Sequence, residues 1–171
     1  MQWEDRLTVR KGNLGEQLVE KYLTSKNFVI YRPTSGPHPF DRLVASADKK
    51  RIFIAEIKTK PSRNKYPDTG FDLRCNQDYL RICISHHMDV FVYFVDERCG
   101  WIYGNSLIEN LYTPRIVHHN GMVLKYPIAA GGIIYFPLEA MEKIAQLPAL
   151  ECKRLADLSS ATRGPQATFR Y

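Results

Sequence analysis

Long apolar runs are missing from this sequence of 171 residues. The apolar runs at 90–95 and 128–136 fall far short of the ~20 residues that cross a bilayer. The first residues also lack the apolar core of a secretory signal. We therefore expect a cytoplasmic protein without a membrane partner.

Cysteine is scarce as well, and its spacing excludes some common uses. The four cysteines include no C-x-x-C pair, which argues against a structural zinc site. Without a secretory segment, disulfide bonds are not expected either. The fold must therefore be held together by an ordinary hydrophobic core.

The composition that is present fits such a core. Hydrophobic residues make up 44% and charged residues 25% of the chain, which excludes a mostly disordered protein. The length fits one domain. We expect a single domain over residues 1–150, with its core at about 10–96 and additions at 97–150, followed by a partly flexible tail at 151–171.

Positive charge is concentrated in the first third of the chain. Lys and Arg outnumber Asp and Glu by 24 to 18 overall, and by 12 to 7 within residues 1–60. Such an excess favours a polyanionic partner such as nucleic acid. Simple solubility is the alternative, because many basic proteins bind no nucleic acid.

The hydrophobic periodicity predicts a mixed α/β domain. In chain order we expect a helix over 13–26, strands over 28–31, 40–46 and 51–58, a loop over 59–72, a helix over 76–87, strands over 89–95 and 101–103, a helix over 105–111, a strand over 133–136 and a helix over 138–146. The uninterrupted apolar run at 90–95 indicates a strand buried on both faces. The order αβββαβ predicts a mixed central sheet flanked by helices, with a C-terminal extension.

The most informative residues lie on the predicted hairpin. If its turn centres between Asp48 and Lys49, the numbers of paired residues sum to 97, and Glu56 pairs with Asp41. Paired residues point to the same face with Cβ atoms about 5 Å apart. Lys58, two residues beyond Glu56, shares that face.

Two carboxylates so close together in a partly buried place need a cation. Mg²⁺ suits them, because it binds one or two carboxylates and keeps several waters. Glu16, at the edge of the first helix, could add a third carboxylate. A metal beside a lysine suits phosphodiester hydrolysis. The alternative without function is a surface hairpin that ends in a Lys–Glu ion pair. It stays open because the bare spacing D-x14-E-x-K occurs by chance in many proteins.

These segments resemble the PD-(D/E)XK nuclease superfamily, and most of all its archaeal-type Holliday-junction-resolvase branch. The resemblance covers about residues 10–96 and rests on four stretches, Gly12–Glu20, Tyr31–Gly36, His38–Ala45 and Ile54–Lys60. One departure is Phe40, which stands directly before the aspartate, with the proline displaced to Pro39. The resemblance implies a restriction-endonuclease-like core.

The resemblance also implies roles for individual residues. Glu16, Asp41, Glu56 and Lys58 would be the catalytic residues. Asp41 and Glu56, with the carbonyl of Ile57, would hold Mg²⁺, for which Mn²⁺ could substitute. Gln77 corresponds to an auxiliary polar residue of some members and is a predicted nucleic-acid contact.

Several further residues are predicted to bind nucleic acid. Lys60, Arg63 and Lys65 lie on the loop that leaves the proposed site, where a phosphate-tracking role and a solvated loop are equally favoured. Arg32 and Ser35 precede the aspartate and could contact the backbone of the cut strand.

The sequence thus predicts a metal-dependent endodeoxyribonuclease, with DNA as its partner. If it resolves junctions, a homodimer would place two sites on a four-way junction. Two alternatives stay open. One is a non-catalytic nucleic-acid-binding module on the same fold, and the other is a nuclease directed at RNA.

Overall fold

The computed structural model describes residues 6–34 and 38–162. Its centre is a six-stranded sheet in the order β1-β2-β3-β5-β6-β11. The elements are α1 (Leu7–Ser25), β1 (Val29–Tyr31), β2 (Arg42–Ala45), β3 (Ile52–Thr59), β4 (Asp68–Asp72), α2 (Leu73–His86), β5 (Asp89–Asp96), β6 (Trp101–Ser106), η2 (Leu107–Leu111), β7 (Arg115–His119), β8 (Met122–Tyr126), β9 (Ile128–Ala130), β10 (Ile133–Pro137), η3 (Leu138–Ala140), β11 (Glu142–Gln146) and α3 (Ala149–Thr162).

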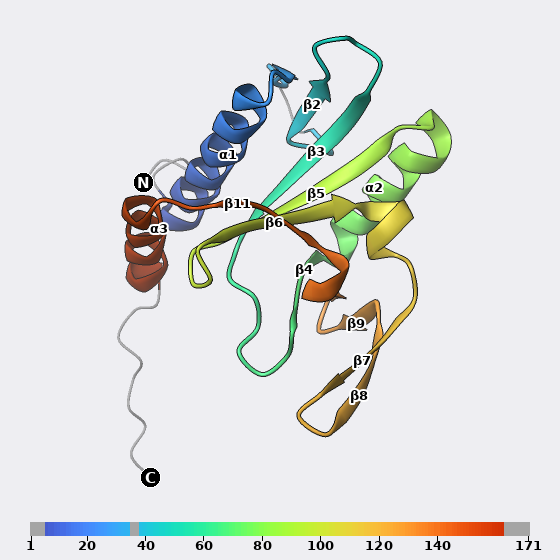
Figure 1. The fold of residues 1–171 in the computed structure, drawn as a ribbon, viewed down its shortest axis with the longest axis vertical. Coiled ribbons are helices and arrows are strands. Elements are labelled where there is room, and N and C mark those ends of the chain that lie inside the picture. Colours follow the sequence, from blue (N-terminus) through green and yellow to red (C-terminus); the bar gives the residue numbers. More distant parts are fainter. Residues whose placement is uncertain (1–5, 35–37, 163–171) are drawn as a thin grey trace.

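Two hydrophobic clusters cover the two faces of the central sheet. Helices α1 and α3 lie side by side on one face, whereas α2 and the three-stranded sheet β4-β10-β9 lie on the other (Figure 1). The hairpin β7-β8 extends away from the central sheet. Strand β3 runs parallel to β5 and antiparallel to β2. The predicted fold class, a mixed central sheet flanked by helices, is confirmed.

The predicted hairpin register is also confirmed. Leu43 pairs with Ile54 and Ala45 with Ile52, so that paired numbers sum to 97. Strand β3 is buried over most of its length, and its side chains alternate between the two clusters. This places its carboxyl-terminal half, which carries the predicted site, in the middle of the sheet.

Helix α1 begins six residues before the predicted start at Asn13. Its N-cap is Arg6, which makes no capping side-chain hydrogen bond, so the sequence offered no cap signal there. The helix approaches β3 closely at Gly15. A Cβ atom on Gly15 would lie 1.8 Å from Oγ1 of Thr59, so only glycine fits this position.

Two predictions about segments beyond the hairpin are wrong. Strand β4 forms within the predicted loop 59–72, because residues 68–72 pair with β10. Most of the predicted helix 138–146 is strand β11, which pairs with the edge of β6, and only Leu138–Ala140 form a 3-10 turn. Both strands are fixed by partners distant in sequence, which local periodicity does not report.

The end of the described chain is a helix rather than a flexible tail. Residues 149–162 form α3, and Leu155 joins the same buried cluster as Leu14 and Leu18 of α1. The rest of the predicted tail, residues 163–171, lies outside the described residues. Within residues 6–34 and 38–162 no helix is both long and apolar enough to cross a membrane.

Candidate active site

Glu56 and Lys58 point from β3 toward α2. Glu56 is 2% exposed, and its Oε1 accepts a hydrogen bond from Nζ of Lys58. The ring of Tyr79, on α2, lies on the same side, with its centroid 5.8 Å from Nζ of Lys58. A buried carboxylate is thus enclosed by one ammonium group and one phenol.

The charge on Glu56 is poorly compensated. Burial and the nearby charge of Asp41 raise the pKa of Glu56, while Lys58 and the hydroxyl of Tyr79 lower it, and the result is a pKa of about 7. The second oxygen, Oε2, is buried and has no hydrogen-bond partner of standard geometry among the described residues. Such an oxygen is costly to bury unless it meets a cation or a donor.

Asp41 lies next to Glu56, as the register requires. Strand β2 begins one residue later, so the carboxylate of Asp41 is free to turn toward β3. Its Oδ2 accepts a hydrogen bond of 2.7 Å from the backbone N–H of Ile57. The role of the Ile57 carbonyl as a metal contact stays a prediction.

Glu16 reaches the same region from α1. Its Oε2 accepts a hydrogen bond of 2.6 Å from Nη2 of Arg42, and Nη1 of Arg42 donates to the carbonyl oxygen of Asp41, also at 2.6 Å. Burial and the charge of Asp41 raise the pKa of Glu16, although Arg42 lowers it. The structure therefore brings all four predicted catalytic residues to one region.

Sequence reasoning missed three residues of this region. Arg42 also donates to Glu20, whose carboxylate accepts a second hydrogen bond from Nε of Arg32 at 2.9 Å. The spacing of Glu16 and Glu20, one helical turn apart, could have indicated Glu20. The adjacency of Arg42 to Asp41 could have indicated Arg42, whereas no local signal pointed to Tyr79.

The loop residues predicted to bind nucleic acid differ in how free they are. Arg63 forms two hydrogen bonds of 2.6 Å with buried Asp68, and its guanidinium lies against the rings of Tyr66 and Tyr135. Burial lowers the pKa of Lys60. Lys65 is exposed. Of the three, Lys65 is the one that faces solvent without an ion pair among the described residues.

The remaining predicted contacts lie further from the carboxylates or outside the description. The side chain of Arg32 is 64% exposed, although it is joined to Glu20. Gln77 is exposed on α2, whereas Tyr79, two residues later, is buried toward Glu56. Residues two apart on a helix face different sides, so Gln77 points away from Glu56. Ser35 lies outside the described residues.

The donor set fits a hard divalent ion. Among residues 6–34 and 38–162, no three His, Cys, Asp or Glu side chains converge as a protein-only metal cage would require. Mg²⁺ needs no such cage, because it binds one or two carboxylates and completes its shell with waters and substrate oxygens. Asp41 and Glu56 supply these two carboxylates, and the unpartnered Oε2 of Glu56 is an available ligand atom.

Comparisons with known proteins give a structural match but no match in sequence. No protein-family model and no curated protein sequence matches this chain. Among solved structures, one that matches is Hjc, a Holliday junction resolvase from the archaeal hyperthermophile Archaeoglobus fulgidus. The two chains are 11% identical, the match covers 82% of this chain and 99% of Hjc, and the TM-score is 0.49.

Proposed function

We propose that this protein is a metal-dependent endodeoxyribonuclease that hydrolyses DNA phosphodiester bonds. One observation carries the proposal: the buried Glu56 carboxylate, whose Oε2 lacks a hydrogen bond of standard geometry among the described residues, lies beside Asp41 and Lys58. This arrangement is costly for a purely structural site, because two carboxylates oppose each other's ionisation there. A bound cation that also contacts a phosphate would offset this cost.

Asp41 and Glu56 would hold Mg²⁺, or Mn²⁺ in its place. A bound divalent ion neutralises charge on the scissile phosphate and acidifies an attacking water. The Ile57 N–H fixes the carboxylate of Asp41, and Arg42 fixes that of Glu16, so both are held in place before substrate arrives. Glu16 then positions a water or a second ion.

Lys58 acts as a cation rather than as a base. Burial lowers the pKa of Lys58, but the charge and hydrogen bond of Glu56, together with the charge of Asp41, raise it, and the pKa is above its usual value. The protonated Nζ can orient the attacking water or stabilise charge on the phosphorane. A metal held by Glu56 would weaken the ion pair between Glu56 and Lys58 and leave the lysine available to the substrate.

The excess of basic residues in the first third supports DNA as the substrate. The proposal includes selectivity for branched DNA of the Holliday-junction kind and assembly as a homodimer. It also includes a single nuclease-like domain over residues 1–150. The sequence resemblance described above supports these finer points.

A cleavage assay tests the proposal. Labelled duplex, single-stranded, flap and four-way-junction DNA are incubated with the protein and Mg²⁺, Mn²⁺ or EDTA. We expect metal-dependent cutting that is abolished in Asp41→Asn and reduced about 100-fold or more in Lys58→Met. Asp48→Asn, in the exposed hairpin turn, is the matched control and should cut normally.

Two outcomes would replace the proposal with one of its alternatives. Salt-sensitive DNA binding without cutting of any substrate would indicate a non-catalytic binding module. Metal-dependent cutting of RNA in a parallel reaction, with every DNA left intact, would indicate an RNA-directed nuclease. Cutting that persists in Asp41→Asn would show that the site around Asp41 does not catalyse the cleavage.

A further inference from the structure

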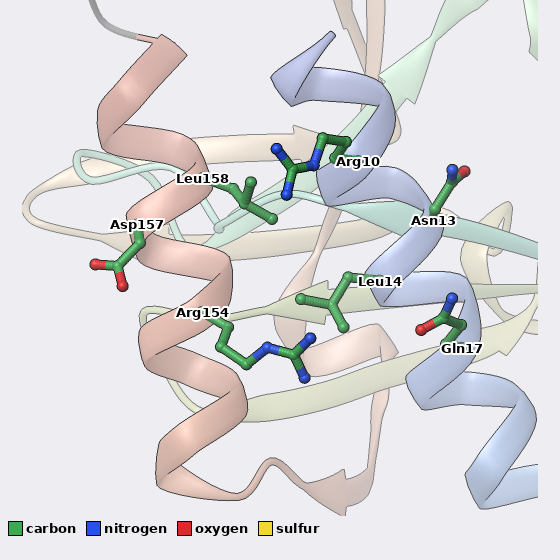
Figure 2. Close-up of a pocket in the computed structure, with 7 residues that line it drawn as sticks. All are labelled: Arg10, Asn13, Leu14, Gln17, Arg154, Asp157 and Leu158. Atoms are coloured by element: carbon green, nitrogen blue, oxygen red, sulfur yellow. The ribbon is translucent and has the colours of Figure 1, made fainter. Parts of the chain in front are cut away.

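A polar groove separates α1 and α3 on the face of the sheet opposite α2. It has a volume of about 430 Å³ and is lined by Arg10, Asn13, Leu14, Gln17, Arg154, Asp157 and Leu158 (Figure 2). The two leucines lie at its base, between the helices. The two helices are also joined by Glu97, which accepts hydrogen bonds from Lys11 of α1 at 2.6 Å and from Ser159 of α3 at 3.0 Å. This connection holds the two walls in a fixed relation.

Two of the residues that line the groove are arginines, and one is an aspartate. The guanidinium groups of Arg10 and Arg154 both point into the space between the helices, whereas the carboxylate of Asp157 points away from it (Figure 2). Arg10 is exposed and forms no ion pair with the residues that the structure describes. Arg154 is 56% exposed and uses only Nη1 to bind Glu151, at 2.9 Å.

The two amide side chains of the groove, Asn13 and Gln17, extend its polar surface along α1 toward Glu16. On the helical wheel of α1, Asn13 and Gln17 lie between Arg10 and the side of Glu16. Arg10 precedes Glu16 by six residues, which corresponds to about 9 Å along the helix axis. Successive phosphates of one DNA strand advance by about 3.4 Å along the duplex axis. Along the axis of α1, Arg10 is therefore about three phosphate spacings from Glu16. Glu56 and Lys58 lie across the sheet, on the face that α2 covers.

We propose that this groove binds backbone phosphates of DNA that passes over α1 and α3. Guanidinium groups match phosphate oxygens in geometry and charge, and exposed ones can reach a backbone that passes over the surface. Neutral amides add hydrogen bonds without reading the bases. The inference rests on the proposed function for the identity of the ligand, and it assigns two arginines that lie outside the catalytic region.

The test measures DNA binding in EDTA, so that it does not depend on cleavage. Fluorescence anisotropy gives the affinity for labelled single-stranded and duplex DNA over a range of salt concentrations. The variant is Arg10→Ala/Arg154→Ala, and Arg10→Gln/Arg154→Gln serves if the alanine variant misfolds. The matched control, Lys26→Ala/Lys153→Ala, removes two exposed charges outside the groove, one directly after α1 and one on α3.

We expect the groove variant to bind about tenfold or more weakly at moderate salt, the effect of one lost charge-assisted hydrogen bond. The slope of log affinity against log salt should fall by about 1.4 for single strands, or 0.7 for each lost phosphate contact. The control should change much less. Equal affinities and slopes in the two double variants, or no DNA binding by the wild-type protein, would overturn the inference.

The outcome is distinguishable from that of the proposed function. If the protein cuts DNA normally and the groove variant binds DNA with the same affinity and salt dependence as the control, the nuclease proposal stands and the groove proposal is wrong. If the protein cuts no DNA, but the groove variant alone shows a lower affinity and a smaller salt slope, the groove proposal stands and the nuclease proposal is wrong.

Discussion

Glu56 is a carboxylate in the middle of a strand whose neighbouring side chains are apolar on both faces. Burial raises its pKa from the usual 4.5 to about 7, so the folded protein holds this proton at pH values where the unfolded chain has lost it. Between pH 4.5 and 7 the native state therefore binds more protons at this position, and the free energy of unfolding falls as pH rises.

We expect the metal-free protein to lose stability between pH 5 and 8 through Glu56, by on the order of 3 kcal/mol. The contribution is fully present below pH 4.5 and is lost as pH rises through 7. Glu56→Gln should flatten this dependence, because the amide carries no charge. Urea unfolding in EDTA at a series of pH values measures it, with exposed Glu139→Gln as the control. An identical pH dependence in Glu56→Gln and wild type would contradict the assignment.

Arg42 compensates Glu16 and Glu20 together, with its side chain 14% exposed. Removing Arg42 leaves the Glu16 carboxylate without its cation, while Glu20 keeps Arg32, and the loss of such a partner costs about 3 kcal/mol or more. We expect Arg42→Gln to lower the free energy of unfolding by this amount, as measured by urea denaturation. Arg81→Ala, which breaks an exposed pair with Asp78, should change stability by less than about 1 kcal/mol. Similar losses in the two variants would show that Arg42 has no such role.

At the scale of elements, α1 and β3 depend on a glycine. A Cβ atom on Gly15 would meet Thr59, whereas one on Gly12 would have no atom within 4 Å. We expect Gly15→Ala to destabilise the protein by about 1–3 kcal/mol through overpacking. Gly12→Ala should stabilise it by about 0.5–1 kcal/mol through helix propensity. Thermal unfolding of the two variants gives the comparison, and shifts of the same sign would contradict the close contact.

The same elements show which parts of the fold the sequence determines locally. The β2-β3 hairpin was predictable in register because a short turn fixes which residues face each other, and this brought Asp41 and Glu56 together. Strands β4 and β11 were not predictable, because their partners β10 and β6 lie far away in sequence. The same reason hid Tyr79, which reaches Glu56 only when α2 packs on the sheet.

For the whole molecule, metal binding and folding should be coupled. A ligand that binds only the native state raises stability by an amount that grows with its concentration, about 1.4 kcal/mol at ten times the dissociation constant. We expect Mg²⁺ to raise the melting temperature at pH 8, and to do so less at pH 6, where Glu56 is protonated. Differential scanning fluorimetry with and without Mg²⁺ measures this. The increase should vanish in Asp41→Asn, and its persistence there would place the metal elsewhere.

The edge strand β11 and the helix α3 come last in the chain, yet they cover elements made much earlier. Strand β11 closes the free edge of β6, and α3 covers the apolar side of α1. At about 5–20 residues per second, a ribosome needs roughly 3–11 s to add the stretch from Leu107 to Thr162. During that interval the nascent chain exposes an unpaired strand edge beside uncovered leucines, the surface that chaperones bind and that initiates aggregation.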